Sequence, residues 1–201
     1  NNDGCTSQAN ALYGVNAAPV NQFNNLSPVC LNADTFSIKG ASTSGNASYF
    51  YNSTGFLDTI SGLYLPANAG VGTETIGFVG LNISTGCSDT LFRNLVIHAI
   101  PNTVLDTFPD FCVNDAPIVL SQGTPIQNGI GVYSGAGVVG SQFFPSLAKV
   151  GNHVLTYKFT DGNNCSISDT EVVVVNALPV LTPATLPDLC QFDTSIVLTG
   201  A

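Results

Sequence analysis

The sequence predicts an all-β protein made of small β-sandwich repeats, and three observations carry that prediction. The chain is 44% hydrophobic but only 8% charged, with 20 glycines and 11 prolines among 201 residues, a composition that favours strands and turns. Two β-rich runs, 153–160 and 168–175, flank the turn sequence DGNN, which indicates a hairpin. Cysteines recur at a regular spacing, which indicates a tandem repeat. Almost no helix is expected.

Six cysteines of two alternating kinds define the repeat. Those of the first kind follow a turn and precede a proline by 14 residues, and those of the second kind precede a β-rich run. Every step from the first kind to the second is 25 residues, and cysteines of the first kind lie 82 and then 78 residues apart. The repeat is therefore about 80 residues long. The first kind comprises Cys5, Cys87 and Cys165, and the second comprises Cys30, Cys112 and Cys190.

Two complete repeats follow from this period, at 20–101 and 102–179. Within them, LYLPANAGVG at 63–72 matches QFFPSLAKVG at 142–151, which supports the alignment. Residues 1–19 then form the last strand of a preceding repeat, and residues 180–201 form the first strands of a following one. We interpret the chain as a window of a longer array.

Short strands are expected throughout each repeat. Six or seven strands in about 80 residues is the size of a small immunoglobulin-like sandwich. Prolines at the junctions between repeats favour short, stiff connections, so we expect the sandwiches to follow one another head to tail as a semi-rigid rod. In the second repeat the strands are predicted near 102–107, 118–121, 131–134, 141–144, 153–160 and 168–175.

The second repeat also resembles a known family. A cysteine and a strand, then GVYSGAGV, then FFPSLAKVGNHVLTYKFTDGNNCSISDTEVVVVNALP, look like the tandem immunoglobulin-like repeats of very large Bacteroidetes surface proteins. These are the gliding-motility-associated adhesins exported by the type IX secretion system, distantly related to HYR and PKD repeats. The resemblance covers 102–179 well and 20–101 with insertions. It implies an extracellular location on the bacterial cell surface, a surface or filament role, and no catalysis in the repeats. Such modules serve as spacers, adhesive heads and appendages of secreted enzymes.

Two regularly placed cysteines in each small, turn-rich repeat predict disulfides formed in an oxidising compartment. Two pairings stay open. Pairing within repeats would join Cys30 to Cys87 and Cys112 to Cys165, but in such a sandwich these positions lie about 20–25 Å apart, whereas a disulfide needs Cα separations of about 4.4–6.8 Å. Pairing across the junction of a rod would join Cys30 to Cys165 instead. The cysteines then left with partners outside the chain are Cys5, Cys87, Cys112 and Cys190.

Composition and motifs exclude several classes of function. Four basic against thirteen acidic residues give a net charge of −9, which disfavours binding to nucleic acid, itself a polyanion. No apolar run reaches the roughly 20 residues that span a bilayer, so no membrane span is expected in this window. No G-x-S-x-G, HExxH or zinc-type Cys/His spacing occurs in the sequence. The chain is therefore not expected to be an enzyme.

Two turns rich in Asp and Asn could offer oxygen ligands to Ca²⁺, although the same residues also suit ordinary turn and capping roles. The candidate ligands are Asp110 and Asp115 in one turn and Asp161 in the other. No other cofactor is expected.

Four Asp-Thr pairs resemble the O-glycosylation sequon of Bacteroidetes proteins, in which an aliphatic residue follows the threonine. By this resemblance Thr59 and Thr90 are the candidate sites. Thr35 and Thr107, each followed by phenylalanine, are looser matches. Asp-Thr is also a frequent pair where a turn meets a strand, and both interpretations stay open.

The first repeat contains an insertion within 41–64 that carries four aromatic residues, Tyr49, Phe50, Tyr51 and Phe56. Some should lie in the core, and others could form an exposed patch for sugar stacking or domain packing.

The favoured function is a stalk or filament shaft that projects an adhesive tip, and the alternative is a module that itself binds polysaccharide or a partner protein. The expected partners are neighbouring repeats of the same chain, with surface polysaccharide or other copies in a fibre as further candidates.

Overall fold

A computed structural model describes residues 4, 7–125 and 128–182 of the chain. The chain divides into two compact units, and nearly all of their regular structure is β-strand. Of the described residues, the first unit takes in those up to 102 together with 128–130 and 159–167, and the second takes in 103–125, 131–158 and 168–182. The predicted all-β class is confirmed.

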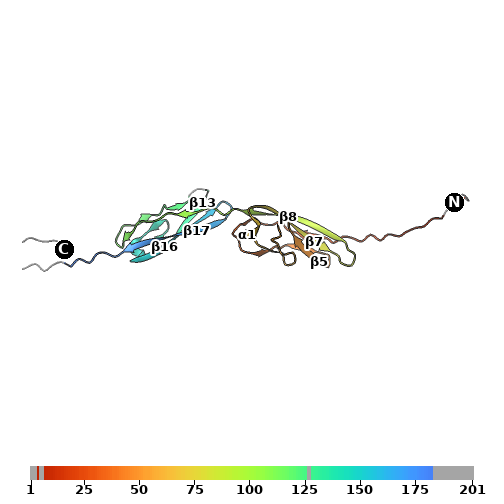
Figure 1. The fold of residues 1–201 in the computed structure, drawn as a ribbon, viewed down its shortest axis with the longest axis horizontal. Coiled ribbons are helices and arrows are strands. Elements are labelled where there is room, and N and C mark those ends of the chain that lie inside the picture. Colours follow the sequence, from red (N-terminus) through yellow and green to blue (C-terminus); the bar gives the residue numbers. More distant parts are fainter. Residues whose placement is uncertain (1–3, 5–6, 126–127, 183–201) are drawn as a thin grey trace, which may run out of the picture. The chain divides into compact units, whose positions relative to one another are not determined.

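The first unit is built on a four-stranded sheet in the order β2, β8, β7, β5, whose three longer strands are labelled in Figure 1. β7 and β8 run antiparallel, from Gly72 opposite Ile97 to Leu81 opposite Ser88. β5 adds antiparallel to β7, whereas β2 adds parallel to the end of β8. The antiparallel order β5, β7, β8 matches the CFG sheet of an immunoglobulin sandwich. The bounds are β2 (Val29–Cys30), β5 (Ala47–Tyr51), β7 (Gly72–Leu81) and β8 (Ser88–His98).

Two short strand pairs and one helical turn supply the opposing layer of this sandwich. Phe23 of β1, Phe50 of β5 and Phe78 of β7 meet in the core, with ring centroids 5.1 to 6.0 Å apart. Burying one such side chain stabilises the fold by roughly 1.5–3 kcal/mol. β1 pairs with β4 and β3 pairs with β6, and α1 follows β6. The bounds are β1 (Asn21–Phe23), β3 (Phe36–Ser37), β4 (Ala41–Thr43), β6 (Leu63–Tyr64) and α1 (Pro66–Ala69).

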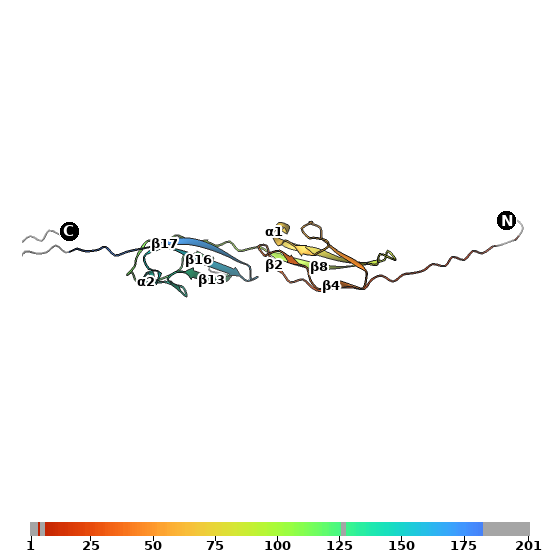
Figure 2. The same ribbon diagram turned by 90° about the horizontal axis from the view of Figure 1, so that it is seen from below.

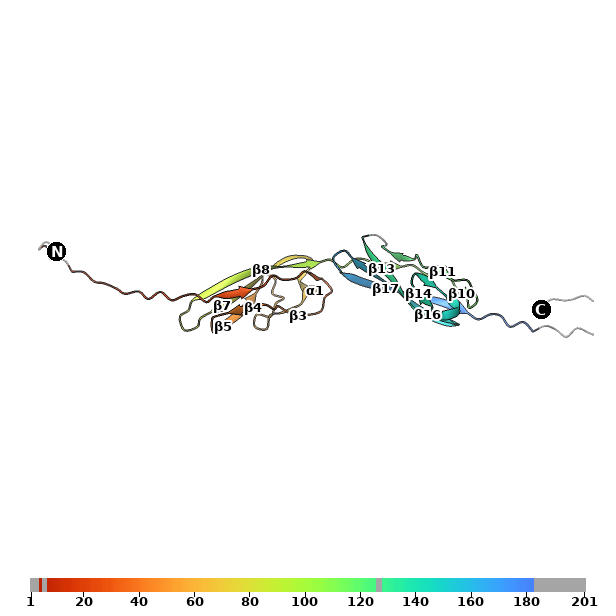
Figure 3. The ribbon, with the colours of Figure 1, turned by 180° about the vertical axis from the view of Figure 1, so that it is seen from behind.

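The strands of the second repeat pair in the same order, with several of them labelled in Figures 2 and 3. The four-stranded sheet β10, β17, β16, β13 again has a two-residue strand, β10, parallel to the end of β17. β9 pairs with β12, and β15 lies between β11 and β14. The bounds are β9 (Val104–Leu105), β10 (Phe111–Cys112), β11 (Ile118–Val119), β12 (Gly123–Thr124), β13 (Gly129–Gly135), β14 (Val138–Val139), β15 (Gln142–Phe143), α2 (Pro145–Ala148), β16 (Gly151–Asp161) and β17 (Ser166–Asn176).

The second repeat has an aromatic core of its own. Phe111 packs on Phe143 with ring centroids 5.4 Å apart, and Tyr133 packs on Tyr157 at 4.8 Å with the rings tilted by 43°. The Tyr157 ring lies so close to β12 and β13 that a Cβ at Gly131, or at the glycine that begins β12, would collide with it. Glycine is required in these two strands because the ring occupies the space of a side chain.

All six strands predicted in the second repeat are present, as β9, β11, β13, β15, β16 and β17. The predicted hairpin is confirmed as β16 and β17 with the turn between them. Sequence reasoning missed β10, β12 and β14, which are each two residues long. The valines of β17 differ in burial, since Val172 is 50% exposed while Val173 and Val175 are buried.

Residues 7–18 are exposed and lie in no strand. A last strand pairs with the other strands of its own repeat. The prediction that 1–19 form the last strand of a preceding repeat therefore stays a prediction. Most of the predicted following repeat, 183–201, lies outside the described residues.

Candidate functional site

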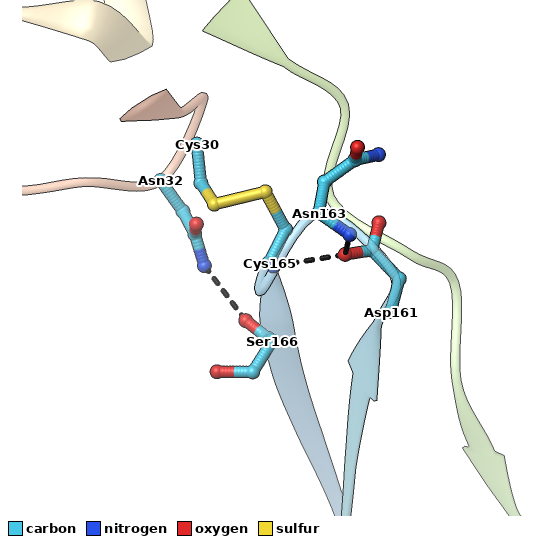
Figure 4. Close-up of a disulfide and its surroundings, with 6 residues drawn as sticks. All are labelled: Cys30, Asn32, Asp161, Asn163, Cys165 and Ser166. Carbon is cyan, nitrogen blue, oxygen red and sulfur yellow. Dashed lines mark hydrogen bonds between the residues drawn. A yellow bond between two sulfur atoms is a disulfide. The ribbon is translucent and has the colours of Figure 1, made fainter. Parts of the chain in front are cut away.

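A disulfide joins Cys30 to Cys165, which are 135 positions apart in the chain (Figure 4). Cys30 ends β2, where the N–H of Leu31 donates to the carbonyl oxygen of His98 at 2.9 Å and the N–H of Ala33 closes a turn on the Cys30 carbonyl at 3.0 Å. Cys165 lies in the turn between β16 and β17 and is fully buried. The two Cα atoms lie 5.5 Å apart, within the range that a disulfide requires.

Hydrogen bonds hold both sides of this bond in place. Asp161 Oδ1 accepts the backbone N–H groups of Asn163 and Cys165, each at 2.9 Å, which shapes the turn that carries the sulfur. On the other side, Asn32 Nδ2 donates to the carbonyl oxygen of Ser166 at 3.0 Å, as Figure 4 shows. The disulfide therefore sits in a hydrogen-bonded frame built from two segments that are distant in sequence.

The within-repeat pairing, Cys30 with Cys87 and Cys112 with Cys165, is not the one that the structure contains. Cys30 lies opposite the last residue of β8, and Cys87 immediately precedes the first. A strand of eleven residues such as β8 separates its ends by about 33 Å. β17 separates Cys112 from Cys165 in the same way. The length of the last strand excludes this pairing.

Two further cysteines carry free thiols. Cys112 is exposed, and Cys87 is partly buried, with its Sγ 3.7 Å from the carbonyl oxygen of Asn16. Cys5 and Cys190, which we expected to have partners outside the chain, lie outside the described residues.

Two of the three candidate calcium ligands accept backbone N–H groups within their own turns. Asp115 Oδ2 accepts the backbone N–H of Cys112 at 2.7 Å, and Asp161 accepts two N–H groups as described above. Asp110 lies on the surface two residues before Cys112. Within 7–125 and 128–182, no group of three or more His, Cys, Asp or Glu side chains is placed to hold a metal ion.

The candidate glycosylation sites differ in accessibility. Thr90 lies in β8 and is only partly exposed. Thr59 lies in a turn that the Asp58 carboxylate stabilises by accepting the backbone N–H and the hydroxyl of Ser61. The bond from the Ser61 N–H, then that from its hydroxyl and that from the N–H of Ile60, hold the pKa of Asp58 below its usual value. Modification stays a prediction, and the exposed candidates are Thr35, Thr59 and Thr107.

The aromatic residues of the insertion divide between core and surface. Phe50 is buried, whereas Tyr51 on the opposite face of β5 lies flat over Gly77 and meets Phe92 of β8 edge-on at 6.0 Å. Tyr49 follows at 6.5 Å from Tyr51 on the same face. We call Tyr49, Tyr51 and Phe92, exposed by 44%, 37% and 52%, the outer aromatic face. The fourth residue of the insertion, Phe56, is 39% exposed.

Sequence reasoning missed a buried carboxylate, Glu74 of β7, which is 6% exposed. Glu74 accepts hydrogen bonds from the hydroxyls of Tyr64 and Thr54 and, at 2.8 Å, from Asn52 Nδ2. Burial, and then the bond to the Glu74 carboxylate and its charge, raise the pKa of Tyr64 well above its ordinary range. The signal in the sequence that could have revealed this carboxylate was a glutamate at a position of β7 where the alternation of the strand places side chains inward. The cluster ties the insertion to the sheet.

The hollows on the surface of the described residues are small. One of about 100 Å³ lies beside Glu74 and Ile97, and one of about 270 Å³ is lined in part by Tyr133 and Tyr157. Both are smaller than the roughly 300–1,000 Å³ typical of sites for drug-sized ligands. Among the helices of the described ranges, none has the length and apolar character that crossing a membrane requires.

No protein-family model and no curated protein matches the chain. Among solved structures, the chain is similar to Drosophila N-cadherin EC1-4, with 13% identity, a TM-score of 0.32 and coverage of 80% of this chain. It spans half the length of that structure. It is also similar to the N-terminal Ig1-2 module of the Drosophila receptor protein tyrosine phosphatase DLAR, with 9% identity, a TM-score of 0.28 and coverage of 81% of this chain and 100% of that one. Likenesses at this level carry no argument about function.

The strand order and the disulfide together describe the kind of module this is. Both repeats carry the antiparallel three-stranded order of an immunoglobulin sandwich. Disulfides persist in oxidising compartments and are rare in the cytosol. The chain is therefore an immunoglobulin-like module of extracellular type.

Proposed function

We propose that the chain is a non-catalytic structural segment, a stalk or filament shaft, of a large repetitive adhesin on the bacterial cell surface. The observation that carries this proposal is the disulfide between Cys30 and Cys165, because it joins the first predicted repeat to the second. The resemblance to the Bacteroidetes gliding-motility adhesins supports the location and the type IX route of export. Glycans on the candidate threonines would protect such a shaft from proteases.

The cross-link changes how the chain carries tension. A pull on the two ends passes along the backbone to Cys30, crosses the sulfur bridge, and leaves through Cys165. The 134 residues between the two cysteines then form a closed loop, and while the bond lasts no end-to-end tension runs through their backbone. The loop contains β3 to β16, which is most of both sheets. A segment of this kind resists extension without relying on the strength of its small cores.

The loop length makes the proposal measurable by pulling single molecules. A residue extends by at most about 3.3–3.6 Å, so the loop withholds about 450–490 Å of contour length. We expect the oxidised chain to extend without this length, and the Cys30→Ser/Cys165→Ser chain to release it at low force. An oxidised chain that releases the same length as the double variant would overturn the mechanical role.

The cellular part of the proposal is tested by immunoelectron microscopy of the native protein on its cells. Labelling along fibres that project from the surface is expected. Labelling confined to a soluble secreted enzyme, or to the cell interior, would contradict a shaft. Because pulling and imaging are separate measurements, the mechanical and the cellular claims can fail separately.

A second candidate function is polysaccharide binding by the outer aromatic face. Three exposed aromatic side chains on one sheet face suit stacking against sugar rings. A glycan array probed with the chain would detect such binding, and the paired change Tyr51→Ala and Phe92→Ala should abolish it. Val119→Ala is the matched control, because this side chain is 64% exposed but lies in the second repeat. Equal binding by both variants would remove this candidate.

A further inference from the structure

We propose that Cys112 and Cys87 are disulfide-forming sites toward another repeat of the same kind. Cys112 would bond the cysteine that corresponds to Cys165 there, and Cys87 would bond the one that corresponds to Cys30. The inference rests on the proposed shaft function, because a shaft grows by joining repeats in series. The partner is identified by chemistry alone: a repeat that presents the complementary cysteine, for which a second copy of this chain is the available probe.

The backbone around Cys112 reproduces the backbone around Cys30. Cys30 lies opposite His98 at the end of β8 in a parallel pair, and Cys112 lies opposite Asn176 at the end of β17 in a parallel pair. The next residue donates its N–H across this pair in both places, at 2.9 Å beside Cys30 and 3.0 Å beside Cys112. The N–H three residues on then closes a turn on the cysteine carbonyl, at 3.0 Å in both. The backbone that carries the Cys112 thiol is thus held by the same hydrogen bonds as the backbone of its bonded counterpart.

The neighbouring groups are duplicated as well. Asn32, two residues after Cys30, donates to the carbonyl of the residue that follows Cys165. Asn114 stands two residues after Cys112 and is exposed, so its amide is available for the same bond. Recognition at Cys112 would therefore use one covalent and one hydrogen-bonded contact, as recognition at Cys30 does.

The turn that carries Cys87 corresponds to the turn that carries Cys165. The N–H of Asn82 donates to the carbonyl of Cys87 at 2.8 Å, and the N–H of Asp161 donates to the carbonyl of Cys165 at 2.9 Å. In each turn an Asx side chain accepts the backbone N–H two residues on, at 3.1 Å in the first repeat and 2.9 Å in the second. The first-repeat turn is one residue longer. Cys87 keeps partial exposure, whereas Cys165 is enclosed by its bond.

The two sites are complementary rather than alike. Each chain presents one cysteine of each kind with a free thiol among its described residues, so a bond from Cys112 of one copy to Cys87 of another leaves one site open at either end. Such a heterologous contact propagates copies in series instead of closing a symmetric dimer. Each bond joins two thiol sulfurs, releases two protons, and passes two electrons to an added disulfide oxidant such as oxidised glutathione, which becomes two reduced thiols.

The test oxidises the chain at high concentration with oxidised glutathione and maps cross-linked peptides by mass spectrometry. Cys5 and Cys190 are first replaced by serine so that the two described thiols are the reactive ones. Cys87–Cys112 bonds should dominate, well above the random share of about one half. A random distribution of pairs, or thiols that end as glutathione adducts without any protein cross-link, would overturn the proposal.

Mixing two single variants sharpens the result. Cys87→Ser and Cys112→Ser should each stay monomeric alone, and their mixture should give one covalent dimer on a non-reducing gel. A dimer formed by either variant alone would contradict complementary pairing. The chain's own Cys30–Cys165 bond, checked in the same peptide map, reports that both variants are folded. Failure here would leave the pulling and imaging results on the shaft untouched.

Discussion

The two repeats fill one inward position of the same strand with different chemistry. Glu74 is the third residue of β7 and His153 is the third residue of β16. The second residue of β6 is Tyr64 and the second residue of its counterpart β15 is Phe143, and both are fully buried. Tyr64 donates its hydroxyl to Glu74, whereas His153 is partly buried and places Nε2 2.8 Å from a backbone carbonyl oxygen.

The difference shows what the sandwich requires at this point. The first repeat buries a carboxylate because its insertion brings Asn52 and Thr54 as additional donors. The second repeat has no such loop, and a phenylalanine closes the core there. The architecture therefore requires a large ring at this place, while the polar partner depends on a neighbouring loop.

The largest expected effect comes from removing the cross-link that distinguishes Cys30 from its counterpart Cys112. Cys30→Ser with Cys165→Ser opens a loop whose ends are 135 positions apart, and chain entropy predicts a loss of about 5 kcal/mol in the free energy of unfolding. Urea denaturation of dilute protein measures it. The matched control, Cys87→Ser with Cys112→Ser, should cost less than about 0.5 kcal/mol. Similar losses in the free energy of unfolding for the two double variants would contradict this difference between Cys30 and Cys112.

The next effect concerns the polar pair of the first repeat. Tyr64→Phe makes this position like Phe143 but leaves the Glu74 carboxylate without one of its donors, which should cost about 1–3 kcal/mol. Adding Glu74→Leu to this variant should recover part of that loss, because both partners are then apolar. Hydrogen exchange along β7 localises the change. A double variant less stable than Tyr64→Phe alone would show that the carboxylate itself stabilises the core.

Alkaline pH should weaken both repeats. Burial raises the pKa of Tyr64, helped by Glu74, and burial raises the pKa of Tyr157, helped by its neighbour Tyr133. The unfolded chain releases these protons near the ordinary value of 10.0 while the folded chain keeps them, so stability is full below that pH and falls as pH rises above it. Thermal unfolding at increasing pH measures the fall, and Tyr64→Phe should make it shallower. A pH-independent melting temperature above this value would contradict the assignment.

The smallest effect lies at the ends of the helical turns. The residue that follows α1 is Gly70, with φ of 84°, and the residue that follows α2 is Lys149, with φ of 70°; glycine adopts such a positive φ without strain. Lys149→Gly should therefore stabilise the second repeat by about 0.5–1 kcal/mol, and Gly70→Lys should destabilise the first by about 1 kcal/mol. A Cβ at Gly70 would meet no atom within 4 Å, so the backbone alone is tested. Thermal unfolding measures both changes, and we expect the melting temperature to rise for Lys149→Gly and to fall by a similar amount for Gly70→Lys.

Much of the fold could be predicted because it is written in local patterns. The alternation in β16 and β17, the turn at Asp161 and the match of 63–72 to 142–151 all depend on neighbouring residues. The two-residue strands β10 and β12 could not be predicted, since each pairs with a strand that is not its neighbour in the chain. An exposed aromatic patch in the insertion could be predicted, but the place of Phe92 in it could not, because only the register that sets Tyr51 opposite Gly77, and Gly77 opposite Phe92, brings the two rings together.

By itself the sequence determined the class, the period of the cysteines and the two ways in which they could pair, because composition, turn chemistry and spacing are properties of the chain alone. Tertiary structure decided which cysteine Cys30 meets, since an eleven-residue strand holds Cys87 at the far end of the same sandwich. It also decided that Glu74 is buried, since only the folded insertion supplies the donors that a desolvated carboxylate needs. Pairing and burial are relations between distant residues, and these become defined when the strands have packed.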